Sequence, residues 1–441
     1  MAEINNEQKP SFREALRFWS RLGWISFGGT AAHIAIMHDY LVDKRKWISN
    51  GSFLHALSLC MMLPGPEAQQ LAIYIGRQLH GKKGGLAAGI LFVLPSMFIL
   101  LALSITYVLF GNLPWIAAMF GGLKPAVIAL IIIALFKIGK KAIRSPLHLI
   151  VAVAGFICMF FYNISLLTVL FGAIVLAIVV RYLRPSLFHN KRPVHVAEEE
   201  EGYYINRHTV SPDGGFGSRR LIRLVVSAFI FWLIPIGLLF AFGSDFRFWK
   251  TLILFFTKTA FVTIGGSYTV IPYVAQFSVA QFHWLSNAQM TDGFALAETT
   301  PGPLIIVLAY VGFMAGYNHF NGSLWMGTIG LLATTFYTFL PCFLFVFGGA
   351  SVVEKTQDNP IIEGILGMVT SVVVGAILNL TLFLSRNVLF PTGSAGPGRL
   401  DLVSLAWVLL SLFLLTKFKL NVIYLILLST LFGLARYWIG Y

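Results

Sequence analysis

The sequence predicts an all-α polytopic membrane protein built from two homologous halves, and three observations support that prediction. Of the 441 residues, 57% are hydrophobic and 11% are charged, whereas a soluble protein has about 25% charged residues. Many apolar runs reach about 20 residues, the length at which an α-helix spans a bilayer. A pattern of glycine, tryptophan and proline also recurs in the second half of the chain. The composition therefore excludes an ordinary soluble enzyme.

The apolar runs divide into about 13 membrane segments by this length criterion. A polar stretch at roughly 183–220 interrupts them and carries an acidic run, Glu198–Glu201, among prolines, glycines and basic residues. Such a stretch is too polar to span a membrane and is typical of a solvated linker. We therefore divide the chain into an N-terminal transporter half (1–182), a cytoplasmic polar linker (183–220) and a C-terminal transporter half (221–441). The predicted segments are 12–38, 51–77, 84–110, 114–138, 145–161, 163–182, 221–243, 249–275, 288–316, 322–350, 361–386, 400–416 and 419–440.

Lysine and arginine cluster in short loops that follow alternate segments, such as Arg77–Lys83 and Lys137–Arg144. Because cytoplasmic loops collect these residues, the N-terminus is predicted to lie in the cytoplasm. The same pattern accounts for the net charge of +14 and argues against nucleic acid as a partner. The loop Lys44–Lys46 disagrees with this orientation. Either that loop is an exception or the first segment is re-entrant, and the same question is open for the eighth segment, 249–275.

An internal duplication relates the two halves. A shift of 237 residues aligns them without a gap from about Phe18 to Ala72. Seven segments separate a repeat unit from its copy, and an odd number makes the two units cross the membrane in opposite directions. Inverted repeats of this kind characterise many secondary transporters. The matched pairs include Gly28–Gly29 with Gly265–Gly266, Trp47 with Trp284, Ser26 with Thr263, and Pro64–Pro66 with Pro301–Pro303.

The Pro-Gly-Pro sequences should break a helix inside the membrane, because proline lacks a backbone N–H and glycine tolerates unusual backbone angles. Such breaks are tolerated where they are buried in protein or line a polar cavity. A helix that restarts after a break exposes unpaired N–H groups that favour an anion. Those groups belong to Glu67, Ala68 and Gln69 in the first repeat and to Leu304, Ile305 and Ile306 in the second. A packing kink is the alternative. The break residues are Pro64, Gly65 and Pro66, and Pro301, Gly302 and Pro303.

A second paired motif places a hydroxyl residue after two glycines. Small residues permit close helix contact, which is the alternative explanation. The hydroxyl kept in both copies favours a role in lining the substrate path, because a hydroxyl can donate to a tetrahedral oxyanion. The predicted lining residues are Gly28, Gly29 and Thr30, and Gly265, Gly266 and Ser267.

Ionisable residues at membrane depth are the third class of candidates, because their burial is costly without a function. Arg21 and Lys258 occupy equivalent repeat positions, and Lys124 opens the fourth segment. Each could neutralise the charge of an anion, or its long side chain could reach the membrane interface instead. Glu67 and Glu298 flank the two breaks and are candidates for proton coupling. A structural hydrogen bond to the broken backbone is the alternative for either carboxyl group.

No residue pattern indicates a cofactor or a metal site. His33 and His38 lie five residues apart, without the four-residue spacing of helical metal ligands, and the three cysteines form no CxxC pair. Gly76–Lys83 has some residues of a phosphate-binding loop but lacks the final Ser or Thr that would hold Mg²⁺. The sequence therefore predicts neither a bound cofactor nor ATP hydrolysis by this chain.

Together these residues resemble the chromate ion transporter superfamily, and specifically its long-chain bacterial members with both halves in one polypeptide. The resemblance implies an inner-membrane secondary transporter that exports chromate, confers chromate resistance and uses the proton motive force. It also implies roles for the family's motif positions, which carry the expected residues here. The motifs are Phe27-Gly28-Gly29, Leu63–Leu71, Phe92–Pro95 and Thr299–Leu304. The positions are Gly28, Gly29, Pro64, Gly65, Pro66, Glu67, Gln69, Lys124, Glu298, Pro301, Gly302 and Pro303.

Two other functions remain open at this point, an uptake permease for sulfate or a related oxyanion and an uncoupled anion channel. An enzyme is not expected, because no nucleophile, base and metal set is clustered in the sequence. The expected partners are chromate, sulfate as a competitor and the lipid bilayer. Neither an ATPase subunit nor nucleic acid is expected, and a homodimer is left open.

Overall fold

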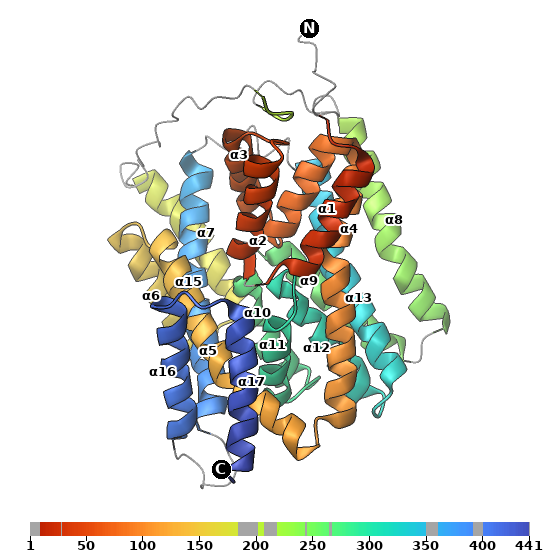
Figure 1. Cartoon of the computed structure of the whole chain (residues 1–441). Coiled ribbons are helices and arrows are strands. Elements are labelled where there is room, and N and C mark those ends of the chain that lie inside the picture. The colour runs from red at the N-terminus through yellow and green to blue at the C-terminus, as the bar shows by residue number, and fades with distance from the viewer. Residues whose placement is uncertain are drawn as a thin grey trace.

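The computed structural model describes residues 9–27, 29–183, 202–206, 218–242, 245–263, 267–349, 360–390 and 400–440. Within these ranges the chain is almost entirely helical, as predicted (Figure 1). The helices are α1 (Phe12–Ile25), α2 (Gly29–His38), η2 (Asp39–Lys44), α3 (Asn50–Met62), α4 (Glu67–Phe110), α5 (Pro114–Ala142), α6 (Pro146–Phe160), α7 (Leu166–Leu183), α8 (Ser218–Phe242), α9 (Phe246–Val262), α10 (Ser267–Gln276), η4 (Phe277–Gln281), α11 (Asn287–Glu298), η5 (Leu304–Ile306), α12 (Val307–His319), α13 (Leu324–Leu344), η6 (Phe345–Gly349), α15 (Pro360–Leu389), α16 (Leu402–Thr416) and α17 (Val422–Trp438).

The first two predicted segments are helical hairpins that begin and end at the same end of the molecule. Arg45 follows η2 and forms an ion pair of 3.3 Å with Glu14 at the start of α1. His80, at a non-helical kink within α4, lies 2.9 Å from the Pro10 carbonyl oxygen through its Nε2. The first contact joins the two ends of the predicted segment 12–38. The second brings the end of the segment 51–77 to the start of the segment 12–38. The chain therefore turns back at the Gly-Gly and Pro-Gly-Pro breaks instead of continuing across.

The second repeat contains the same two hairpins. His319, at the end of α12, lies 2.8 Å from the Asp245 carboxylate that precedes α9. The Asn318 side chain donates a hydrogen bond of 2.8 Å to the Trp284 carbonyl, between η4 and α11. The loops at 245, 284 and 319 therefore meet at one end of the molecule, as the loops at 10, 45 and 80 do in the first repeat.

These hairpins answer the question that the sequence left open for the first and eighth segments, because both are re-entrant. The segments 51–77 and 288–316 turn back as well, so four of the thirteen predicted segments are hairpins rather than single crossings. The loop Lys44–Lys46 consequently shares its end with Lys82 and Lys83, which removes the disagreement in the distribution of basic loops.

The two repeats are inverted with respect to one another. In Figure 1, α3 lies in the half of the molecule near the N-terminus, and its counterpart α11 lies in the opposite half. Among the described residues, five helices lie between the two repeats: the second part of α4, α5, α6, α7 and α8. An odd number of crossings reverses the direction of the second repeat, which is the reason for the inversion.

Equivalent aromatic clusters hold the hairpin ends in both repeats. Phe18 stacks on Tyr40 at 4.2 Å between ring centroids and meets Trp47 edge-on at 6.1 Å. The residues 237 positions later, Phe255, Phe277 and Trp284, contact one another in the same combinations, at 5.9 Å and 5.6 Å. Aromatic pairs stabilise a fold beyond the area that they bury. The duplication therefore extends from sequence to side-chain packing.

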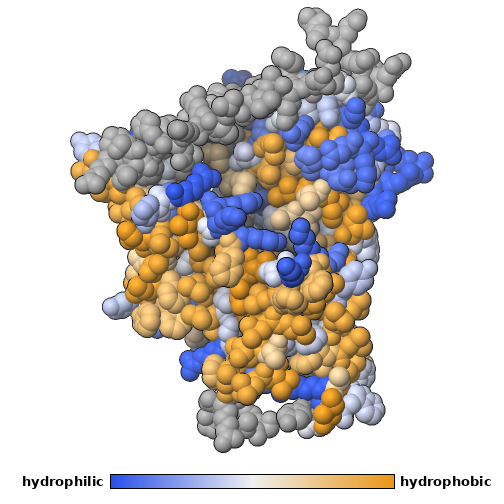
Figure 2. Space-filling model, turned by 60° about the vertical axis from the view of Figure 1, so that its left-hand side comes forward, coloured by the Kyte–Doolittle hydropathy of each residue, from blue (hydrophilic) through white to orange (hydrophobic). Residues whose placement is uncertain are grey.

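The outer helices of each half pack against helices of the other half. The helix α5 packs against α16 and α17, whereas α15 packs against α6 and α7. Among the described residues, six helices are long and apolar enough to cross a membrane: α4, α5, α7, α8, α13 and α15. Figure 2 shows hydrophobic residues over most of one face of the molecule. This surface is suited to contact with lipid.

One close helix contact gives a stability prediction. A Cβ atom on Gly122 of α5 would overlap the Ser429 carbonyl of α17, whereas a Cβ on the adjacent Gly121 would meet no atom of the described residues within 4 Å. Overpacking of this kind costs about 1–3 kcal/mol. We therefore expect Gly122→Val to lower the melting temperature of the purified protein in detergent and the matched control Gly121→Val to leave it near wild type. Equal melting temperatures would contradict the close contact of α5 with α17.

Candidate functional site

The two Pro-Gly-Pro breaks meet the opposite repeat through a reciprocal pair of backbone hydrogen bonds. The Gly65 N–H donates to the Thr263 carbonyl at 2.6 Å, and the Gly302 N–H donates to the Ser26 carbonyl at 2.7 Å. Both donors and both acceptors are equivalent under the 237-residue offset. A reciprocal contact of this kind is the signature of a twofold relation. We call this region, where residues 64–66 and 301–303 meet Ser26 and Thr263, the crossing.

Only glycine fits the central position of each break. Gly65 and Gly302 have φ angles of +127° and +99°, which residues with a side chain rarely adopt. An added Cβ would approach Cys342 in the first repeat and would overlap Ser96 in the second. Cys342 and Ser96 each directly follow a proline, Pro341 and Pro95. The crossing is therefore closely packed and symmetric in its backbone.

The helix that restarts after the first break has a polar beginning. Pro66 provides no side-chain cap, so the first N–H groups of α4 have no partner within the helix. The buried amide groups of Gln69 and Gln70 donate to the Gly89 and Pro64 carbonyls, and both carboxamide oxygens are buried without a hydrogen-bond partner among the described residues. Glu67 is half-buried at the first helical position. This terminus combines backbone N–H groups that have no partner within the helix with polar side chains.

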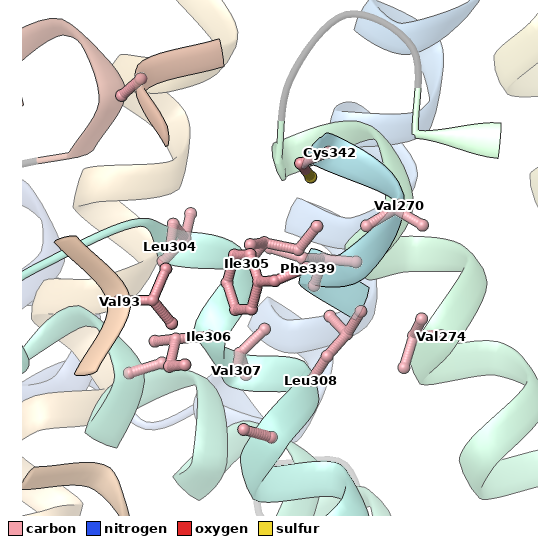
Figure 3. Close-up of a cluster of buried hydrophobic side chains, with 14 of the residues drawn as sticks. Val93, Val270, Val274, Leu304, Ile305, Ile306, Val307, Leu308, Phe339 and Cys342 are labelled. Carbon is pink, nitrogen blue, oxygen red and sulfur yellow. The ribbon is translucent and has the colours of Figure 1, made fainter. Parts of the chain in front are cut away.

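The second break leads into apolar surroundings. Leu304, Ile305 and Ile306 form one 3₁₀ turn before α12, and each is at most 3% exposed. Figure 3 shows their side chains in a cluster of buried hydrophobic residues that includes Val93 and Phe339. The crossing is therefore symmetric in its backbone and asymmetric in its chemistry, because polar residues follow only the first break.

The two carboxyl groups that flank the breaks differ in their surroundings. The Glu298 side chain is buried at the end of α11 and accepts a hydrogen bond of 3.4 Å from the Tyr268 hydroxyl. That hydroxyl would lie 3.9 Å from a Cβ on Gly29 of the other repeat. Tyr268 therefore lies between the buried carboxyl group and Gly29 of the first Gly-Gly motif. Sequence analysis missed Tyr268, although it directly follows the hydroxyl of the second motif.

The first Gly-Gly motif lies close to the crossing. Gly29 begins α2 with a φ of +76°, Thr30 is half-buried beside it, and the buried His33 places its Nε2 2.9 Å from the Ser26 carbonyl. The same carbonyl accepts the hydrogen bond from Gly302. Gly28, Gly265, Gly266 and the side chain of Ser267 lie outside the described residues.

The candidate cations are placed differently from one another. Arg21 and Lys258 are exposed on α1 and α9. Lys124 lies on α5 and forms an ion pair of 2.8 Å with Asp292 of α11. The Tyr107 hydroxyl donates a hydrogen bond of 2.9 Å to the other oxygen of Asp292.

Asp292 is the main functional candidate that sequence analysis missed. It is an acidic residue inside the apolar segment 288–316, so the rule that selected Glu298 could have found it. Its lysine partner is 168 residues earlier in the chain, and no local pattern connects the two. Glu298 lies six residues further along α11, about 9 Å at the rise of an α-helix. The helix α11 therefore reaches from the ion pair to the crossing.

The ion pair opens into a cavity of about 310 Å³ between the end of α4, the start of α5, α11 and α12. This volume can hold several water molecules. The lining residues are Tyr107, Val108, Gly111, Asn112, Ala117, Phe120, Lys124, Gln289, Asp292, Met314 and Tyr317. Among the described residues, no group of three or more His, Cys, Asp or Glu side chains could hold a metal ion.

Comparisons with known proteins agree on one family. The family profile described as "Chromate transporter" matches residues 13–178 and 250–434, which together make up most of the chain. The chain is 26% identical to the chromate transport protein of Cupriavidus metallidurans, over 93% of this chain and 89% of the relative. It is 27% identical to the probable chromate transport protein of Synechococcus elongatus, over 89% of this chain and 90% of the relative. It is 29% identical to the chromate transport protein of Pseudomonas aeruginosa, over 85% of this chain and 82% of the relative. No solved structure matches the chain significantly.

Proposed function

Because the chain belongs to the chromate transporter family, we propose that it transports chromate across the bacterial inner membrane. We propose further that it works as an exporter driven by the proton motive force, so that it confers chromate resistance. Three relatives named for chromate transport, each similar over more than four fifths of both chains, support the substrate. Basic loops at the N-terminal end of the molecule support a cytoplasmic N-terminus.

The observation that carries this proposal is the reciprocal crossing in a chain of this family. Inverted repeats with broken helices are the architecture in which secondary transporters alternate access to a central site. The bonds from Gly65 to Thr263 and from Gly302 to Ser26 link each break to the other repeat. A rocking motion of one repeat against the other would act on both breaks at once.

The first break is the better candidate for the anion site within the crossing. Its N–H groups, the buried Gln69 amide and Thr30 are polar, whereas the second break leads into the apolar cluster of Figure 3. In this proposal Lys124 supplies positive charge to the path, and Glu67 and Glu298 exchange protons. Arg21 and Lys258 are exposed, and their charges would attract the anion through the electrostatic potential at the protein surface.

The proposal is tested by accumulation of radiolabelled chromate in everted membrane vesicles, with and without a protonophore. Accumulation above the level of membranes without the protein, abolished by the protonophore, is expected. Excess sulfate added to the same assay measures selectivity among oxyanions. Accumulation that persists with the protonophore would point to an uncoupled channel. If no chromate accumulates in everted vesicles and sulfate enters intact cells, the protein is an uptake permease and not an exporter.

Four substitutions test the proposed site in the same assay. Gly29→Val, Pro66→Leu, Glu67→Gln and Lys124→Gln are each expected to reduce flux while the protein remains in the membrane. Immunoblots of the vesicles measure the amount of each variant, and flux is expressed per protein. Wild-type flux in all four variants would contradict the site assignment.

A further inference from the structure

The structure assigns Asp292 a role that follows from its contact with Lys124: we infer that it is the resident counterion that an oxyanion displaces from Lys124. The inference deepens the proposed function and rests on it for the class of ligand, a tetrahedral oxyanion. It concerns the cavity between α4, α5, α11 and α12, which is separate from the crossing.

Lys124 is the member of the pair that an incoming ion can reach. Its side chain is 26% exposed and lines the cavity, whereas the Asp292 side chain is only 8% exposed. Among the described residues that line the cavity, these two are the only charged ones. An anion entering the cavity therefore meets a single cation, which is already paired with a carboxylate at 2.8 Å.

The charges make the two partners of Lys124 compete. One ammonium group cannot neutralise both a carboxylate and a doubly charged oxyanion, and two anions close together repel each other strongly at low dielectric. Binding of the oxyanion must therefore lengthen or break the contact between Lys124 and Asp292. The competition weakens binding, which helps a transporter because a tightly held ion would not leave.

The surroundings of the pair suit such an exchange. The Tyr107 hydroxyl donates a hydrogen bond of 2.9 Å to Asp292. This bond can still stabilise the carboxylate when the Lys124 ammonium group moves to the oxyanion. Gly293 allows the Tyr310 ring to pack directly on α11 beside Asp292, where a Cβ would overlap it. The amides of Asn112 and Gln289 also line the cavity and can donate to the oxygens of a bound ion.

The test is an equilibrium binding measurement on the full-length protein, purified into lipid nanodiscs, with radiolabelled chromate and separately with radiolabelled sulfate. Asp292→Asn removes the competing charge and keeps the shape of the side chain. We expect it to lower the Kd for the oxyanion by roughly tenfold. Lys124→Gln, which removes the cation of this cavity, should weaken the binding. Tighter binding cannot come from damage to the fold, so this result separates the counterion role from a purely structural one.

A second ion pair at comparable burial provides the matched control. Asp401 and Arg436 also pair at 2.8 Å, with side chains 12% and 31% exposed, and neither lines the cavity. Asp401→Asn removes the same charge, so it should leave the Kd unchanged. Equal tightening in Asp401→Asn and Asp292→Asn would mean that net charge alone acts, and it would overturn the inference.

The inference and the proposed function fail in different ways. Unchanged or weaker oxyanion binding in Asp292→Asn overturns the counterion role even if vesicles accumulate chromate. Tighter binding in Asp292→Asn but not in Asp401→Asn supports the role even if no chromate flux is seen, and in that case the proposed function fails instead. If neither the wild type nor Asp292→Asn binds chromate or sulfate, the inference is also overturned.

Discussion

Replacement of Gly302 by alanine is expected to abolish chromate flux and to lower the melting temperature of the protein markedly. The φ angle of +99° costs a residue with a side chain about 1–2 kcal/mol. The new Cβ would also overlap Ser96, whose own Cβ lies 2.9 Å from the added atom, and overpacking adds about 1–3 kcal/mol. The displaced break would pull the Gly302 N–H away from the Ser26 carbonyl. Flux in everted vesicles and thermal unfolding in detergent measure the two effects.

Two further glycine variants separate the causes of this effect. Gly81 also has a positive φ, of 60°, but a Cβ there would meet none of the described residues within 4 Å, so Gly81→Ala should show the conformational cost alone. Gly65→Ala would press on the ends of the Gln70 and Cys342 side chains, which can move more easily than Ser96. We therefore expect the loss of stability to decrease from Gly302→Ala to Gly65→Ala to Gly81→Ala. A Gly302→Ala protein no less stable than Gly81→Ala would contradict the close packing at the crossing.

The second large effect is expected when Lys124 is replaced by glutamine, because the Asp292 carboxylate is then left almost buried without its cation. Removal of one partner from a buried ion pair costs about 3–5 kcal/mol, and the partial exposure of Lys124 places this site at the lower end of that range. The melting temperature of Lys124→Gln should therefore fall, and the flux should be lost.

The double variant Lys124→Gln/Asp292→Asn shows whether the lost flux is only a consequence of lost stability. It removes both charges, so most of the stability should return, whereas flux should stay low because none of the described residues that line the cavity then carries a positive charge. Asp292→Asn alone should be milder than Lys124→Gln, since the lysine can still be solvated from the cavity. Recovery of flux in the double variant would show that Lys124 has no role in binding.

Much of the fold was predictable because its causes are local. The length and apolar character of each run predict a membrane helix, and proline and glycine break a helix wherever they occur. The duplication is visible in the order of residues from Phe18 to Ala72, and the structure repeats it in the aromatic contacts of Phe18 and Phe255. The paired breaks were therefore found at the right residues, and the family follows from the same motifs.

Contacts between distant parts of the chain could not be predicted in this way. A run of 27 residues from 12 to 38 is long enough to cross the membrane, and its composition does not say whether it turns back at the Gly-Gly motif. The ion pair of Glu14 with Arg45 decides that question. The distribution of basic loops contained a hint, since Lys44–Lys46 fitted only a re-entrant segment or an exception.

The sequence by itself determined the membrane class, the repeat, the positions of the breaks and the family, because each depends on the residues within one segment or on their order. Tertiary structure alone decided the direction of the hairpins and the crossing of the repeats. It alone decided the partner of Lys124 and the apolar surroundings of Leu304–Ile306. These features depend on which helices pack together, and packing joins residues such as Tyr107 and Asp292 across 185 positions of the chain.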